Sequence, residues 1–318
     1  ALLLIMAMLF GIASGINGSF LSLQSAVRQR KVVALHQGID ACLRPVLAVV
    51  ALYLFNNSGY SALIGYLFGM LIITTSQGIF ALRNDEIRSH WHGKKLDKNK
   101  ERDNISEFFS YGFSMTIFAG FAAVSMYSDR WILQSLLGER EVGIYVATYQ
   151  IANAPIALLV GMINQFAVPI IFDRAGAMTS AEQAENSARL LRQTIALSSV
   201  VMFAVVIAAI IWGELIVKVL TTSAFAEYYK ILWVVTLGIA LFNIGQMLSL
   251  KGFYYNRTNV YLLPKAIQAV SFVISAFFLT KLYGVLGMAL TLAFSSLLYL
   301  LAVYLVNTRK LSKSLSQL

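Results

Sequence analysis

Asp40 and Arg44 carry opposite charges four residues apart in an otherwise apolar stretch. This spacing places both side chains on one face of a helix. A guanidinium held by a carboxylate matches the geometry of phosphate oxygens, so one interpretation is an anion-binding arginine. The other is an ion pair at the edge of a membrane, whose apolar stems let its charges reach water. The residues themselves leave both interpretations open.

Further charges interrupt apolar runs in the second half of the chain. Lys265 lies near the start of one run, where it could bind an anion or extend its stem to water. Asp129 and Arg130 are adjacent and cannot share one helix face, so substrate contact and a role as helix-end anchor both stay open. Charges that face lipid cost at least about 2.5–3.5 kcal/mol each, so we expect these side chains to face an interior.

Three amides, Gln150, Asn153 and Asn164, fall close to one face of a long apolar segment near residues 143–171. Such side chains hydrogen-bond either a polyhydroxylated substrate or a neighbouring helix.

The chain lacks the sequence motifs of phosphate-binding loops, zinc peptidases, paired-cysteine sites and serine hydrolases. We therefore expect no enzyme, no bound metal and no cofactor.

The composition is that of a membrane protein. Hydrophobic residues make up 58% and charged residues 13%, against about half and about 25% in soluble domains. Apolar runs of about 20 residues match the hydrocarbon core, and their continuity indicates helices rather than barrel strands. We expect an all-α polytopic protein with nine spans near residues 2–24, 41–55, 60–81, 109–136, 143–171, 191–212, 231–251, 260–280 and 285–306.

Lys and Arg gather in the loops after the first and third predicted spans and in the C-terminal tail. By the positive-inside rule these segments, and the C-terminus, are cytoplasmic. The same rule accounts for the net charge of +10, so we expect no nucleic-acid partner. The polar stretch 82–107 is predicted to be a cytoplasmic linker.

An internal repeat relates residues 11–33 to residues 238–260 without a gap. The identical positions in the first block are Gly11, Ile12, Ala13, Gly18, Leu21, Ser22, Leu23, Arg30 and Val33. Three further spans precede only the second block, so we expect two six-helix halves in a parallel repeat, with nine of twelve spans present. The expected divisions are a first bundle at 1–81, the linker, a second bundle at 108–308 and a tail at 309–318.

The segment SDRWILQSLLGEREVGIYVATYQIA (128–152) resembles the signature of polysaccharide flippases in the multidrug/oligosaccharidyl-lipid/polysaccharide exporter superfamily. The blocks SLQSAVRQRK (22–31) and YGVLGMALT (283–291) resemble two further helices of that family. The resemblance implies two bundles in a V around a central cavity, and alternating access. It also implies a cargo, an undecaprenyl-pyrophosphate-linked oligosaccharide such as an O-antigen unit of lipopolysaccharide, crossing the bacterial inner membrane.

On this resemblance the partners are the lipid-linked substrate, membrane lipid, and a polysaccharide polymerase with its chain-length regulator. The candidate substrate-binding residues are Asp40, Arg44, Asp129, Arg130, Gln150, Asn153, Asn164 and Lys265. One alternative is a drug or small-cation exporter of the same superfamily, although Arg44 and Lys265 favour anionic cargo. Another is a membrane polysaccharide polymerase or ligase, against which the short predicted outer loops argue.

Overall fold

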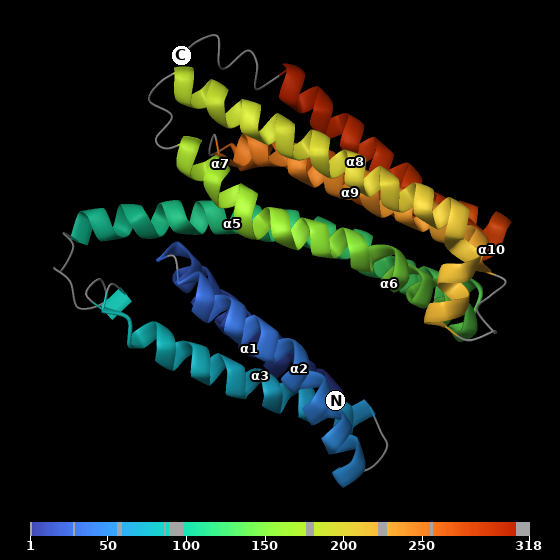
Figure 1. Cartoon of the computed structure of the whole chain (residues 1–318), viewed down its shortest axis with the longest axis horizontal. Helices are drawn as coiled ribbons and strands as arrows, with labels where there is room; N and C mark the ends of the chain where they lie inside the picture. Colours follow the sequence, from blue (N-terminus) through green and yellow to red (C-terminus); the bar gives the residue numbers. More distant parts are fainter. Residues whose placement is uncertain are drawn as a thin grey trace. The chain divides into compact units, whose positions relative to one another are not determined.

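The computed structural model describes residues 2–27, 29–55, 59–85, 87–88, 98–175, 181–221, 228–254 and 257–309. Within these ranges every regular element is a helix, which confirms the all-α class. The chain divides into two compact units, unit 1 (Ala1–Glu101) and unit 2 (Arg102–Leu318), coloured blue to teal and green to red respectively (Figure 1). Most of the predicted tail, and residues 86 and 89–97 of the predicted linker, lie outside the described residues.

Unit 1 contains three long helices, α1 (Leu2–Ala26), α2 (Arg30–Phe55) and α3 (Gly59–Leu82), and α3 packs against both others. The contact between α3 and α2 is close. A Cβ atom at Gly65 would lie 2.3 Å from the Leu47 carbonyl oxygen and 2.5 Å from the Ala48 Cα. Small residues let membrane helices approach in this way, so Gly65 fixes how α3 lies on α2.

Helix α2 begins at Arg30, well before the predicted span at 41–55. Its first half contains Arg, Lys, His, Gln and Asp, which lower the local hydropathy although they do not prevent a helix. The apolar run therefore marked only the latter part of the helix.

Helix α5 (Lys98–Leu136) starts inside the stretch expected as a linker, and all of it from Arg102 onward belongs to unit 2. Unit 2 continues through α6 (Glu139–Met162), the π-helical turn η1 (Ile163–Ala167), α7 (Val168–Ala175) and α8 (Ala181–Leu220). The last elements are α9 (Tyr229–Tyr254), the short η3 (Thr258–Tyr261) and α10 (Leu262–Arg309). Helix α9 packs against α6, α8 and α10, and is the most buried candidate span.

Two glycines with positive φ mark the sharp turns of unit 2. Gly138 (φ 108°) separates α5 from α6. The first turn of α6 then contains Glu139 and Glu141, whose charges suit a helix N-terminus. Gly284 (φ 60°) breaks α10. An unbroken 48-residue helix would be about 72 Å long, far more than a hydrocarbon core of about 30 Å, and the break separates the two spans predicted there.

Among the described residues, seven helical segments are long and apolar enough to cross a membrane. They are Leu4–Ala26, Arg30–Phe55, Gly59–Leu82, Glu139–Asp173, Glu185–Leu220, Tyr229–Phe253 and Thr258–Arg309, the last of which holds two predicted spans. The remaining predicted span, 109–136, lies in α5, whose side chains are described only in part.

The helix bounds repeat at the spacing of the sequence repeat, the interval from Gly11 to Gly238. The ends of α3 and α10, Leu82 and Arg309, are this interval apart. The break in α10 corresponds to the gap between α2 and α3, so the last three helical segments of unit 2 repeat the order of unit 1.

We expect Gly65→Ala to destabilise the intact protein by about 1–3 kcal/mol, because the added methyl group must push α3 away from α2. The matched control is Gly15→Ala on α1, where no atom lies within 4 Å of an added Cβ. Unfolding temperatures in detergent should fall for the first variant and hold or rise for the second. Equal temperatures for the two variants would show that this close approach does not hold unit 1 together.

Candidate functional site

The ion pair of unit 1 joins Arg44 to Asp40, with Arg44 Nη2 donating to Asp40 Oδ2. The Arg44 and Asp40 side chains are 27% and 15% exposed. About 20 residues of helix are enough to cross the hydrocarbon core. Both charges lie among the about 20 residues of α2 that end at Phe55, and therefore within the core. At that depth an unpaired charge is expensive, so the pairing neutralises each partner.

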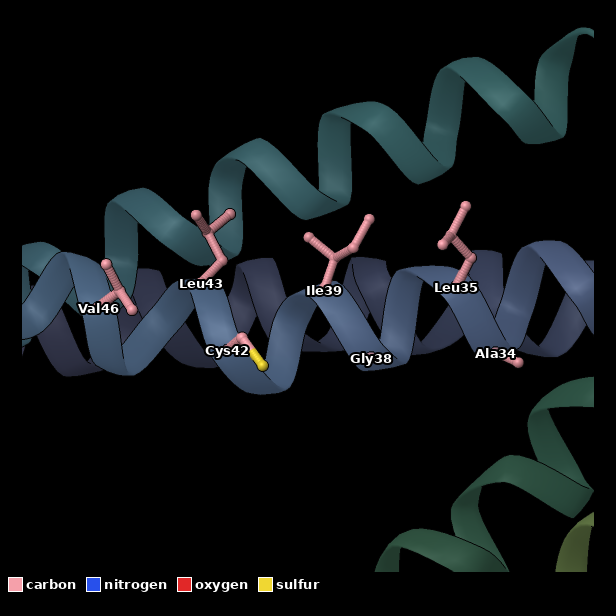
Figure 2. A pocket seen from close by; sticks show the side chains of 7 residues that line it. All are labelled: Ala34, Leu35, Gly38, Ile39, Cys42, Leu43 and Val46. Carbon is pink, nitrogen blue, oxygen red and sulfur yellow. The ribbon is translucent and has the colours of Figure 1, made fainter.

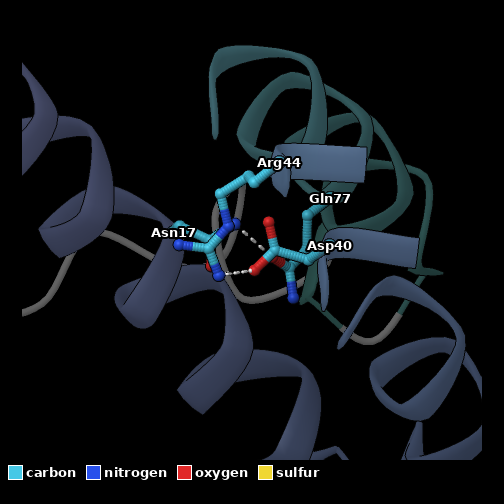
Figure 3. A network of polar contacts seen from close by, with 4 residues as sticks. All are labelled: Asn17, Asp40, Arg44 and Gln77. Atoms are coloured by element: carbon cyan, nitrogen blue, oxygen red, sulfur yellow. Dashed lines mark hydrogen bonds and ion pairs between the residues drawn. The ribbon is translucent and has the colours of Figure 1, made fainter. Parts of the chain in front are cut away.

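An amide relay connects α1 to α3 next to this ion pair. Asn17 Nδ2 donates to Gln77 Oε1 at 2.7 Å, and Gln77 Nε2 donates to Gln24 Oε1 at 3.1 Å. Gln24 Nε2 in turn donates to the Gln77 backbone oxygen at 3.3 Å. Figure 3 shows Asn17 and Gln77 beside Arg44 and Asp40, so side chains from three helices meet there. We call Asn17, Asp40, Arg44 and Gln77 the unit 1 polar cluster.

The stem of Arg44 lies directly against α3. A Cβ atom at Gly69 would be 3.0 Å from Arg44 Cγ and 3.2 Å from Arg44 Cα. About two turns earlier on α2, His36 Nε2 lies 3.1 Å from the Ser76 hydroxyl oxygen. The contact at Gly69 fixes the base of the arginine, while its guanidinium keeps an open side.

The opposite strip of α2 is apolar. A shallow depression there is lined by Ala34, Leu35, Gly38, Ile39, Cys42, Leu43 and Val46 (Figure 2). It suits a lipid chain or an apolar helix face and offers nothing to a charged cargo.

In unit 2, Lys265 is fully buried and does not extend to water. Its ammonium nitrogen lies 4.1 Å from the ring centroid of Phe242 and 4.4 Å from that of Tyr299. Both distances are in the range of cation–π attraction, which is stronger when the cation is desolvated. The Tyr299 hydroxyl donates to Gln246 Oε1, which holds the second ring in place.

Phe242 also lines a cavity of about 30 Å³, which has Asp129, Tyr149 and Gln268 as its polar lining. The space can hold one or two waters. Asp129 is buried and accepts a hydrogen bond from the Arg130 backbone N–H at 2.7 Å. Gln268 Oε1 is also buried and has no hydrogen-bond partner among the described residues. Carboxylate, phenol and amide oxygens around such a space suit an ordered water or a small cation.

Phe242 thus connects two of the predicted residues, Lys265 and Asp129. Arg130 points elsewhere, with its Cζ 5.7 Å from the Tyr127 ring centroid, as adjacency on a helix requires.

The structure does not bring the three predicted amides to this cavity. Gln150 and Asn164 are exposed and Asn153 is half-buried. Tyr149, next to Gln150, is the side chain from that helix that lines the cavity. Gln268 was not predicted as a site residue, although it follows Lys265 by three positions on one helix face.

Within the described ranges no three His, Cys, Asp or Glu side chains gather as a metal site.

Comparison with protein families matches residues 1–174 to the family described as polysaccharide biosynthesis protein. This match covers more than half of the chain, and the chain belongs to that family. A comparison with curated proteins finds no match.

Solved transporters share the fold. A MATE P26A mutant superposes with a TM-score of 0.75 at 14% identity, covering 95% of this chain and 67% of the other. An inward-facing multidrug resistance MATE transporter of the MOP superfamily gives 0.68 at 13%, covering 90% and 65%. The lipid II flippase MurJ, in an inward closed conformation, gives 0.60 at 14%, covering 96% and 60%.

The chain spans about two thirds of these structures' own length or less. The comparisons confirm the exporter-like fold and the resemblance to the polysaccharide exporter family. The chain is therefore a multi-pass membrane protein.

The aromatic contacts of Lys265 predict a difference between two substitutions of Tyr299. Tyr299→Phe loses the bond to Gln246 but keeps the ring, and should cost about 1 kcal/mol. Tyr299→Leu also removes the ring from the buried ammonium and leaves space, and should cost about 3 kcal/mol or more. Unfolding temperatures in detergent measure the difference. If both variants unfold at the same temperature, the ring does not stabilise Lys265.

Proposed function

We propose that this protein is an alternating-access flippase that moves an undecaprenyl-pyrophosphate-linked oligosaccharide across the bacterial inner membrane. The cargo would be an O-antigen unit or a similar surface polysaccharide unit, and the C-terminus would be cytoplasmic. Transport of this kind makes and breaks no covalent bond, so the protein would not be an enzyme. A polymerase and its chain-length regulator would use the delivered units.

Arg44 is the observation that carries the proposal. A diphosphate cannot enter hydrocarbon unless cationic donors replace its water. An arginine presents five N–H donors in a planar fork that fits phosphate oxygens, and the bond to Asp40 uses one of them. The family match and the flippase-like fold support the same reaction class.

A second candidate, export of a drug or small cation, is favoured by one feature. The buried Asp129 lines a cavity together with the oxygen-bearing side chains of Tyr149 and Gln268. One structure of the same fold is a multidrug transporter. That site is small, whereas a lipid-linked glycan needs contacts along a long path. Asp129 therefore fits a small ion better than the main cargo.

Arg44→Ala should lower surface glycan at least about tenfold in a strain that depends on this protein, because a cationic contact to the diphosphate is lost. Arg44→Lys should restore part of the glycan, since it keeps the charge without the fork. The control is Lys218→Ala, which breaks an exposed ion pair with Glu214 on α8 and should leave the glycan unchanged. Protein levels must match in all strains. Normal glycan in the Arg44→Ala strain would remove Arg44 from the site.

A further inference from the structure

We infer that Asp40 competes with the diphosphate of the cargo for Arg44, and thereby promotes release of the cargo. The inference rests on the proposed function, because it requires an anion to reach Arg44. It assigns Asp40 a role in release, in addition to holding the arginine.

Asp40 stays close to Arg44 whether or not an anion is bound, because both residues belong to one helix. Asp40 lies one helical turn before Arg44, so the pair can separate and re-form through side-chain rotation alone. Gly69 of α3 meets the Arg44 stem, which leaves the guanidinium as its mobile part. Asp40 is the carboxylate that the structure pairs with Arg44.

The neighbouring amides cannot take over this role. Gln77 is buried, and both ends of its side chain are engaged, by Asn17 and by Gln24. Turning Gln77 toward Arg44 would break two hydrogen bonds in a dry interior. The relay keeps one wall of the unit 1 polar cluster fixed while Arg44 changes partner.

The charges explain why the exchange is reversible. In the empty state the Asp40 carboxylate neutralises Arg44, which prevents an unpaired cation inside hydrocarbon. When a diphosphate binds the Arg44 guanidinium, the Asp40 carboxylate lies beside a second anion in a medium of low dielectric. The repulsion weakens binding and favours the return of Arg44 to Asp40. An arginine without this acid would hold the anion more tightly and release it more slowly.

The test measures equilibrium binding of farnesyl diphosphate to the intact protein in detergent. Asp40→Asn should lower the Kd about tenfold, by removal of the like charge. In transport assays the same variant should show a lower KM together with a lower kcat, because release slows. Asp40→Glu restores the carboxylate and should return all three values toward wild type.

Glu214→Gln is the matched control, because Glu214 pairs with Lys218 at the same four-residue spacing on α8, at 2.5 Å. It should leave binding and transport unchanged. If Asp40→Asn fails to fold, Asp40→Ser removes the same charge with a smaller side chain and serves the same measurement.

The outcomes separate the two proposals. Unchanged or weaker probe binding after loss of the Asp40 charge, in a folded variant, overturns the competition, and Asp40 is then only a structural partner. Equal binding by wild type and Arg44→Ala overturns the anion site itself, and with it the proposed function. Tighter binding with slower turnover supports both.

Discussion

A charge inside hydrocarbon requires a partner, and this requirement determines both clusters described above. In unit 1 the partner of the charge is an acid, because Asp40 lies one turn from Arg44. In unit 2 the partners are two aromatic rings, those of Phe242 and Tyr299, which lie against the Lys265 ammonium. An ion pair can exchange one anion for another, whereas a cation between two rings is held in a fully buried position. On the proposed function, unit 1 is the part suited to transient contact with an anionic cargo.

The two units share their helix order but not their chemistry. At the interval from Gly11 to Gly238, Arg44 corresponds to Ser271 and Lys265 corresponds to Gly38. Each cation thus occurs in one repeat only, on equivalent helices but at different depths. The repeat maintains the arrangement of helices through close contacts such as that at Gly65. It leaves the polar positions free to differ, which lets one fold serve unlike cargoes.

The sequence predicted the helical class, the break between residues 280 and 285 and the common face of Asp40 and Arg44, because each depends on local spacing. It did not predict where α2 begins, since polar residues obscured the first turns of that helix. The contacts of Asn17 with Gln77 and of Lys265 with Phe242 were also not predicted. They depend on which helix faces meet, and one sequence does not contain that information.

Transport by the purified intact protein in sealed vesicles distinguishes a flippase for lipid-linked oligosaccharide from an exporter of small cations. Vesicles would carry a fluorescent polyprenyl-diphosphate oligosaccharide in one leaflet, with a cationic dye as the competing cargo in parallel samples. We expect movement of the lipid-linked oligosaccharide between leaflets and no accumulation of the dye. Transport of the dye without movement of the oligosaccharide would show that the protein is not this flippase.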